Sequence, residues 1–184
     1  MLYIGAGTYE EELVLAASGA EDEPIEIVGD VDGAATGDAG EVLLLGDRRT
    51  QRLWLLDQVE HVEIRGFTIR GGKSRGIEIF QSSDVVIRDC IVEEMTRKHH
   101  SDGVWIRGSD VEIIGCTIRN VRARGVRIDS GSNVVIRSCN IHDNEKAGVH
   151  AHSEDAEFTI TRSRITGNGE HGVAFKRGRG LITD

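Results

Sequence analysis

Aromatic residues are scarce in this chain, and no long apolar run is present. Only 4% of the 184 residues are Phe, Trp or Tyr, which is expected of a thin core filled by Val, Ile and Leu. No stretch approaches the about 20 apolar residues that span a bilayer, so we predict no membrane partner. The start, Met1-Leu2-Tyr3-Ile4, lacks the regions of a secretory signal. The sequence therefore does not assign a cellular location to the protein. The location is extracellular or periplasmic if a signal peptide was removed from a longer parent protein.

Proline and cysteine are also rare. Pro24 is the only proline, and turns must therefore be made by Gly, Asn, Asp and Ser. The three cysteines, Cys90, Cys116 and Cys139, are far apart in the sequence. Such spacing argues against a zinc knuckle, and side chains in register on parallel strands rarely reach the disulfide torsion. We predict free, buried thiols that act as small hydrophobes and stack as a ladder.

Three short motifs recur along the chain in step with one another. The first reads Val62-Glu63-Ile64, Val85-Val86-Ile87, Val111-Glu112-Ile113, Val134-Val135-Ile136 and Phe158-Thr159-Ile160. The second reads Gly76-Ile77-Glu78-Ile79, Gly103-Val104-Trp105-Ile106, Gly125-Val126-Arg127-Ile128, Gly148-Val149-His150-Ala151 and Gly172-Val173-Ala174-Phe175. The third places Phe67, Cys90, Cys116, Cys139 and Ser163 two residues before Ile69, Val92, Ile118, Ile141 and Ile165. Three apolar-x-apolar segments per 23 to 26 residues are typical of one solenoid coil.

The period-two pattern of each motif indicates a strand with one buried and one exposed face. Such runs are too short to be helices. We therefore predict an all-β parallel β-helix of about seven coils with three short strands per coil, in which equivalent residues stack at about 4.8 Å. Residues 1–184 form one domain in this prediction. The noisier first sixty residues belong to it, with Ile25 aligned to Val62 and an edge loop from Asp30 to Gly40.

Both ends of the chain fall inside the repeat. Leu2-Tyr3-Ile4 reads as a strand, and Ile182 follows Phe158 by one period of 24 residues, as the next copy of the first motif. Uncapped coils expose apolar core and unpaired strand edges. We expect a fragment of a longer gene, a trimmed or designed chain, or a homo-oligomer that pairs through the solenoid ends.

Charge is divided unevenly along the sequence. Residues 1–60 hold 14 acidic residues and three Arg, whereas residues 61–184 hold 17 acidic and 19 basic residues. The net charge of −9, together with the absence of a groove-reading element, argues against nucleic acid as a partner. The second part of the chain can still present a local basic strip.

The outward residues of the second motif carry the most chemistry. The predicted stacking gathers eight candidates from three coils: Asp102, Trp105, Arg107, Arg124, Arg127, Asp129, His150 and His152. A loop with His99 and His100 flanks them. Arg neutralises a carboxylate, Trp offers a flat face to a sugar, and His exchanges protons. We assign catalytic roles to Arg127, His150 and Asp102, and substrate binding to the other five.

Other interpretations of the same residues remain open. A solvated row of charges explains Arg107, Arg127 and Asp129 without any ligand. Trp105 is either a ligand platform or a side chain covered by the loop Thr96–Asp102, and His150 and His152 lack a third metal ligand. Asp102 and Asp129 could form a carboxylate pair for hydrolysis or bind Ca²⁺. No cofactor and no metal site is predicted otherwise.

Several segments resemble a known group of proteins. They are Gly5-Ala6-Gly7-Thr8-Tyr9-Glu10, Ser18-Gly19, Glu23-Pro24-Ile25-Glu26-Ile27 and the Gly-Val-x-Ile and Asn-Val-Val-Ile-x-x-Cys repeats. Together they resemble the right-handed parallel β-helix proteins of the pectate-lyase-like superfamily, and the N-terminal stretch is most similar to the chondroitinase-B and alginate-lyase types. The resemblance covers the whole chain and implies right-handed coils. It also implies a catalytic Lys and Arg on successive coils. No Lys here matches that base, and Arg127-Ile128-Asp129-Ser130 and Gly148-Val149-His150-Ala151-His152 occupy the comparable strands.

Two functions follow from the sequence. The first is a carbohydrate-active β-helix that binds or cleaves an acidic polysaccharide, as a polysaccharide lyase or a related enzyme. The second is a non-catalytic structural or self-associating β-helix. The lack of a lysine that matches the catalytic base, together with the uncapped ends, favours the second function. The charged and aromatic residues on the outward face favour the first.

Overall fold

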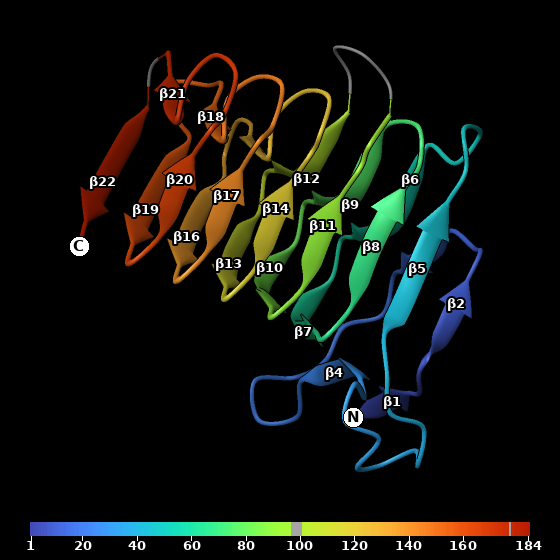
Figure 1. Ribbon diagram of the computed structural model, residues 1–184. Helices are drawn as coiled ribbons and strands as arrows, with labels where there is room; N and C mark the ends of the chain where they lie inside the picture. The colour runs from blue at the N-terminus through green and yellow to red at the C-terminus, as the bar shows by residue number, and fades with distance from the viewer. Residues whose placement is uncertain (97–100, 177) are drawn as a thin grey trace.

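The computed structural model describes residues 1–96, 101–176 and 178–184, and within them every regular element is a strand. The strands wind through three parallel sheets, so that each sheet receives every third strand. In Figure 1 the strands β5, β8, β11, β14, β17 and β20 lie side by side in sequence order from blue to red. The predicted parallel solenoid of about seven coils, with three strands in each, is confirmed.

Sheet A consists of β1 (Leu2–Ile4), β4 (Ile25–Gly29), β7 (Glu60–Arg65), β10 (Ser83–Arg88), β13 (Asp110–Ile114), β16 (Asn133–Arg137), β19 (Glu157–Thr161) and β22 (Arg179–Thr183). Sheet B consists of β2 (Gly7–Tyr9), β5 (Val42–Gly46), β8 (Thr68–Gly71), β11 (Ile91–Glu93), β14 (Thr117–Arg119), β17 (Asn140–His142) and β20 (Arg164–Thr166). Sheet C consists of β3 (Leu13–Leu15), β6 (Arg52–Asp57), β9 (Arg75–Phe80), β12 (Asp102–Arg107), β15 (Val126–Ile128), β18 (Val149–Ala151) and β21 (Val173–Phe175).

Equivalent apolar residues of successive coils pair directly, because the period-two pattern fixes which face is buried. In sheet A, Val85 pairs with Val62 and Val111, and Ile87 pairs with Ile64 and Ile113. These inward side chains are almost fully buried. Each ladder of Val and Ile therefore runs through the interior, and the three sheets enclose one continuous apolar core.

In sheet C, glycines stand at the start of β9, β12, β15, β18 and β21, and at the first four of these the next coil leaves no room for a side chain. A Cβ on Gly125 would lie 2.6 Å from the carbonyl oxygen of Gly148, and one on Gly103 would lie 2.7 Å from that of Gly125. Neither distance is compatible with a normal contact. This close approach explains the glycine that opens the first four copies of the second motif, whereas a Cβ on Gly172 in the last copy would lie 3.7 Å from its nearest neighbour.

Buried polar side chains satisfy the backbone at two other corners. Ser82 accepts a hydrogen bond from the amide of Val59, and Ser109 accepts one from the amide of Ser82. Asn144 accepts one from the amide of Val121 and donates one to the carbonyl of Ile118. Each such side chain bonds a neighbouring coil, which supplies partners for backbone groups that the turns leave unpaired.

The cysteines lie at the corner between sheets A and B. All three are buried and unbridged. The amide of Thr117 donates to the carbonyl of Cys90, and the amide of Asn140 donates to the carbonyl of Cys116, so the three thiols sit on successive coils. The neighbouring thiol of Cys116, followed by burial, raises the pKa of Cys139. The three thiols are therefore enclosed in the apolar core, where they pack as small hydrophobic groups.

The N-terminal coils follow the same plan. Ile25 pairs with Val62 as predicted, and residues 30–40 leave the solenoid between β4 and β5. Asp30 organises this excursion, because one carboxylate oxygen accepts hydrogen bonds from the amides of Ala35 and Thr36 and from the hydroxyl of Thr36. These bonds lower the pKa of Asp30, mainly through the Thr36 amide. The insertion is an ordered loop with its own side-chain anchor.

Two predicted boundaries were wrong. The loop expected at Thr96 to Asp102 ends one residue earlier, because Asp102 is the first residue of β12 and pairs with Arg75. The last copy of the first motif is shifted by two residues, since Phe158 pairs with Gly180 and Ile182 pairs with Ile160. The ring of Phe158 fills the place that a side chain at position 180 would need. The residues 97–100, with His99 and His100, lie outside the described part.

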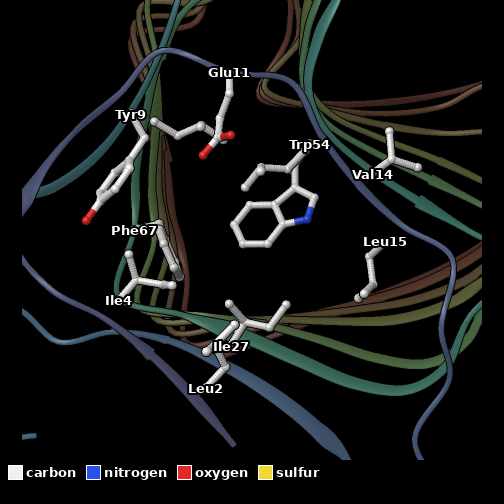
Figure 2. Close-up of a pocket in the computed structure, with 11 residues that line it drawn as sticks. Leu2, Ile4, Tyr9, Glu11, Val14, Leu15, Ile27, Trp54 and Phe67 are labelled. Atoms are coloured by element: carbon white, nitrogen blue, oxygen red, sulfur yellow. The ribbon is translucent and has the colours of Figure 1, made fainter. Parts of the chain in front are cut away.

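The first coil leaves its interior accessible through an apolar cavity of about 210 Å³ (Figure 2). Trp54 of the second coil lines this cavity, and the ring of Phe67 lies edge-on to the Trp54 ring at a centroid distance of 5.1 Å. Leu2 and Val14 border the cavity and are largely exposed. Leu181 and Ile182 are similarly exposed in β22.

In the residues that the structure describes, no helix is long and apolar enough to cross a membrane.

Candidate functional site

The predicted candidates do come together on the outer face of sheet C. Trp105 pairs with Glu78 on one side and Arg127 on the other, and Arg127 pairs in turn with His150. Parallel pairing in register places these outward side chains in one row. The sequence-based grouping of Trp105, Arg127 and His150 therefore matches the geometry.

Trp105 lies beneath a layer of guanidinium groups. Its side chain is only 8% exposed. The guanidinium carbon of Arg75 lies 3.8 Å from the ring centroid, and those of Arg107 and Arg127 both lie at 4.9 Å. The indole Nε1 donates to Asp129 at 2.8 Å. Since cations already cover the ring, Trp105 does not offer the open sugar platform that one interpretation of the sequence required.

Glu78 and Asp129 are buried carboxylates of this face, and both are held in ion pairs. Glu78 receives Arg75 at 3.1 Å and Arg52 at 3.4 Å. Asp129 accepts Nε and Nη2 of Arg127, each at 3.0 Å. Buried charges persist when they are paired in this way, and the pairs fix the positions of the arginines.

Asp102 is a third buried carboxylate and binds a different arginine. It is 3% exposed, and Nη1 of Arg124 donates to its Oδ1 at 3.0 Å, with Oδ2 at 3.4 Å. Arg127 approaches Oδ2 less closely, at 3.9 Å. Arginines therefore occupy both carboxylate oxygens of Asp102, and this geometry does not present the carboxyl group to a substrate.

His150 is a half-buried imidazole beside these cations. Burial, followed by the charges of Arg124, His152 and Arg127, lowers the pKa of His150 to about 4, and Asp129 opposes the shift. The ring of His152 lies edge-on at a centroid distance of 5.4 Å. His150 is therefore neutral at physiological pH and can accept a proton.

A cavity of about 360 Å³ opens next to His150. Its wall is formed by Arg124, Lys146, Ala147, His150, Glu170, His171, Ala174, Phe175 and Lys176. Arg124, Lys146 and Lys176 stand beside one carboxylate, Glu170, so the formal charge of the wall is positive before its two imidazoles are counted. An anionic group is the chemical species that such a wall favours.

Of the nine residues of this wall, only Arg124 and His150 were among the candidates predicted from the sequence. Lys146, Glu170, His171 and Lys176 belong to turns or strand ends whose motifs vary between coils. The corner before each glycine did point to Arg124, because a residue there stacks on its equivalent one coil away. By contrast Trp105, Arg107 and Asp129 do not line the cavity.

His152 faces a second hollow, of about 690 Å³, together with Ser130, Ser153, Glu154, Asp155 and Lys176. It thus lies beside the cavity of His150 and shares Lys176 with it. Among the described residues, no group of three or more His, Cys, Asp or Glu is placed to hold a metal ion. Asp102 and Asp129 are both engaged by arginines, and calcium binding by this pair stays a prediction.

Comparison with known proteins defines the family. Residues 55–184 match the family described as right handed beta helix region. The chain belongs to this family. The match includes all the strands that carry the outward row and the cavity, and the coils of this β-helix are right-handed, as the resemblance implied. No curated protein sequence matches the chain.

Solved structures of low sequence identity share the β-helix. The chain is similar to pectate lyase Pel9A with a TM-score of 0.70 and 12% identity, over 91% of this chain and 45% of that protein. The catalytic domain of a GH87 alpha-1,3-glucanase gives 0.64 and 16%, over 98% and 34%. An alginate lyase from Paenibacillus sp. str. FPU-7 gives 0.58 and 16%, over 84% and 66%.

The chain spans between about a third and two thirds of the length of these three proteins. At such low identity the likeness concerns the fold. The residues of the outward row must therefore be judged by their own geometry.

Proposed function

We propose that this β-helix binds and cleaves an acidic polysaccharide at the cavity beside His150. The observation that carries the proposal is a neutral imidazole in the wall of a cavity that is otherwise rich in cations. The names of the similar structures, which include a pectate lyase and an alginate lyase, support the same class of substrate.

The reaction that suits this wall is a β-elimination at a uronate. Arg124 neutralises the sugar carboxylate, which acidifies the hydrogen on the adjacent carbon. His150 accepts that proton, the carbon–carbon double bond forms, and the bond to the glycosidic oxygen breaks. The leaving oxygen takes a proton from the imidazolium of His150 or from a lysine ammonium of the wall. No other reactant is consumed.

The proposal changes two of the roles inferred from the sequence. Proton transfer is assigned to His150, with Arg124 in place of Arg127 as the group nearest the substrate carboxylate, because Arg124 lines the cavity and Arg127 does not. Trp105 and Asp129 support the arginines from below.

The test is an incubation with alginate, pectate or chondroitin sulfate, followed by the ultraviolet absorbance of the unsaturated product. We expect product from at least one polymer, and its loss in His150→Gln. The matched control is His61→Gln, because His61 and its partner Asp84 both lie on sheet A, away from His150 on sheet C. Absence of product from all three polymers, with and without Ca²⁺, contradicts cleavage.

A second proposal is self-association of the 184-residue chain through its ends. It is supported by the accessible apolar cavity in the first coil and the exposed Leu181 and Ile182 in the last strand. Static light scattering is expected to give a mass above 20.1 kDa that rises with concentration. Val14→Asp should lower that mass, whereas Val31→Asp, a change of another largely exposed valine in the 30–40 loop, should not. A strictly monomeric chain at high concentration contradicts self-association.

A further inference from the structure

Among the cations that line the cavity, Arg124 has one buried carboxylate as its partner. Among the described residues, Asp102 is the carboxylate that Arg124 pairs with, at 3.0 Å. The other two buried carboxylates of the face serve other arginines, since Glu78 holds Arg75 and Asp129 holds Arg127. Arg124 also stands out because it is only 16% exposed although it reaches the cavity wall.

Asp102 itself does not line the cavity. It is the first residue of β12, where it pairs with Arg75 of the preceding coil, and the backbone amide of Gly103 donates to the carbonyl of Arg124. The carboxylate and the guanidinium are thus attached to adjoining coils at the same corner. Such a pair holds one orientation of the long arginine side chain, which otherwise has many rotamers.

We infer that Asp102 is a positioning residue that directs the Arg124 guanidinium to the cavity wall beside His150, where an anionic sugar group binds. This inference rests on the proposed function for the identity of the anion. The geometric part, that Asp102 determines where Arg124 lies, stands without any substrate.

His150 reports on the position of Arg124. The charged and titratable groups that face or surround this imidazole are Arg124, Arg127, Asp129, Lys146, His152, Glu170, His171 and Lys176. Burial and then Arg124 contribute most to the lowered pKa of His150, whereas Asp102 is not among the main contributors. A change at Asp102 therefore reaches His150 mainly through movement of Arg124.

The experiment is an NMR titration of the His150 side chain in the free protein. In Asp102→Asn the amide no longer holds the guanidinium by charge, so we expect Arg124 to leave the wall and the pKa of His150 to rise. Arg124→Gln should raise it in the same way. Adding Asp102→Asn to Arg124→Gln should then change nothing further, which is the result that identifies an effect through Arg124.

Two comparisons separate positioning from general loss of structure. Asp129→Asn is the matched control, because it removes another buried carboxylate of the same face that bonds Arg127 and Trp105, so a rise in the pKa of His150 is not expected. Asp102→Glu retains the charge and should restore the low pKa at least partly. An unchanged His150 titration in Asp102→Asn, or a rise that persists in the Arg124→Gln background, contradicts the inference.

A binding measurement then tests the link to the anion. Tetragalacturonate and an uncharged cello-oligosaccharide of equal length are titrated into the wild-type protein and Asp102→Asn. We expect at least a tenfold loss of affinity for the charged ligand only. An equal loss for both ligands contradicts the assignment of Arg124 to the anion. If neither ligand binds the wild-type protein, the proposed substrate fails, and the NMR titration still decides whether Asp102 positions Arg124.

Discussion

The roles of individual side chains on sheet C depend on what covers them. Trp105 and His150 occupy equivalent outward positions two coils apart, yet the indole is buried under guanidinium groups and the imidazole borders a cavity. The repeat in the sequence predicted that they share a row. It could not predict their exposure, because exposure depends on the long side chains of neighbouring coils and on turns that differ in length.

Proton transfer by His150 makes a prediction about pH. The pKa of about 4 means that the imidazole stays neutral through mildly acidic conditions and is protonated only below that value. We expect the acid limb of kcat/KM to fall near pH 4, well below the ordinary value of about 6.5 for histidine. Arg124→Gln should move this limb upward. A limb near pH 6.5 in the wild-type protein contradicts the role of His150.

Glu93 provides a stability prediction on sheet B. It is nearly buried and accepts Nε of Arg70 at 2.6 Å and Nε of Arg119 at 2.8 Å. Burial alone would raise the pKa of Glu93, but the bonds to the two arginines outweigh it and lower the pKa. Because the folded pKa is depressed, the stabilisation is present above the unfolded value of about 4.5 and is lost as the pH falls through the lower folded value.

The change that tests this is Glu93→Gln. We expect it to reduce the free energy of unfolding by about 1–2 kcal/mol at pH 7 and by much less at pH 3. Urea denaturation at both pH values measures the difference. Glu112→Gln is the control, since its pair with Arg137 is exposed and such pairs contribute less than about 1 kcal/mol. Equal losses at pH 7 and pH 3 contradict this account of Glu93.

Strands and corners were the most predictable elements. The alternation of Val, Ile and Leu is enough to predict the register of Val85 with Val111, because a shift by one residue would expose the whole apolar set. The exception was the last strand, where Gly180 faces Phe158. At this position the ring of Phe158 leaves room only for a glycine on the neighbouring strand. The pattern of apolar residues does not show such a difference in side-chain size, so it did not predict this register.

The glycine corner gives a test at this scale. In Gly125→Ala the new methyl group would meet the carbonyl of Gly148 at 2.6 Å, so the coils must separate, at a cost of about 1–3 kcal/mol. The unfolding midpoint in urea measures the loss. Gly172→Ala is the matched control from the same motif, because its Cβ would have 3.7 Å to the nearest atom. If both substitutions have the same effect, close approach of successive coils is not the reason for these glycines.

The whole molecule combines an acidic N-terminal third with a balanced remainder. Residues 1–60 hold 14 acidic residues and three Arg, whereas the cavity wall in the later coils carries Arg124, Lys146 and Lys176 against Glu170. A polyanion is thus repelled at one end and attracted to the other. At physiological ionic strength the Debye length is about 8 Å, so this preference acts near the surface and weakens as salt is added.

The most direct measurement of the central claim is an NMR titration of the labelled 184-residue chain with an acidic oligosaccharide, at low and at high salt. The account predicts shifts concentrated on residues around the cavity, with Arg124, His150 and Lys176 among them, and a lower affinity at high salt. Shifts confined to the first coil or to sheets A and B, or no binding at low salt, would contradict it.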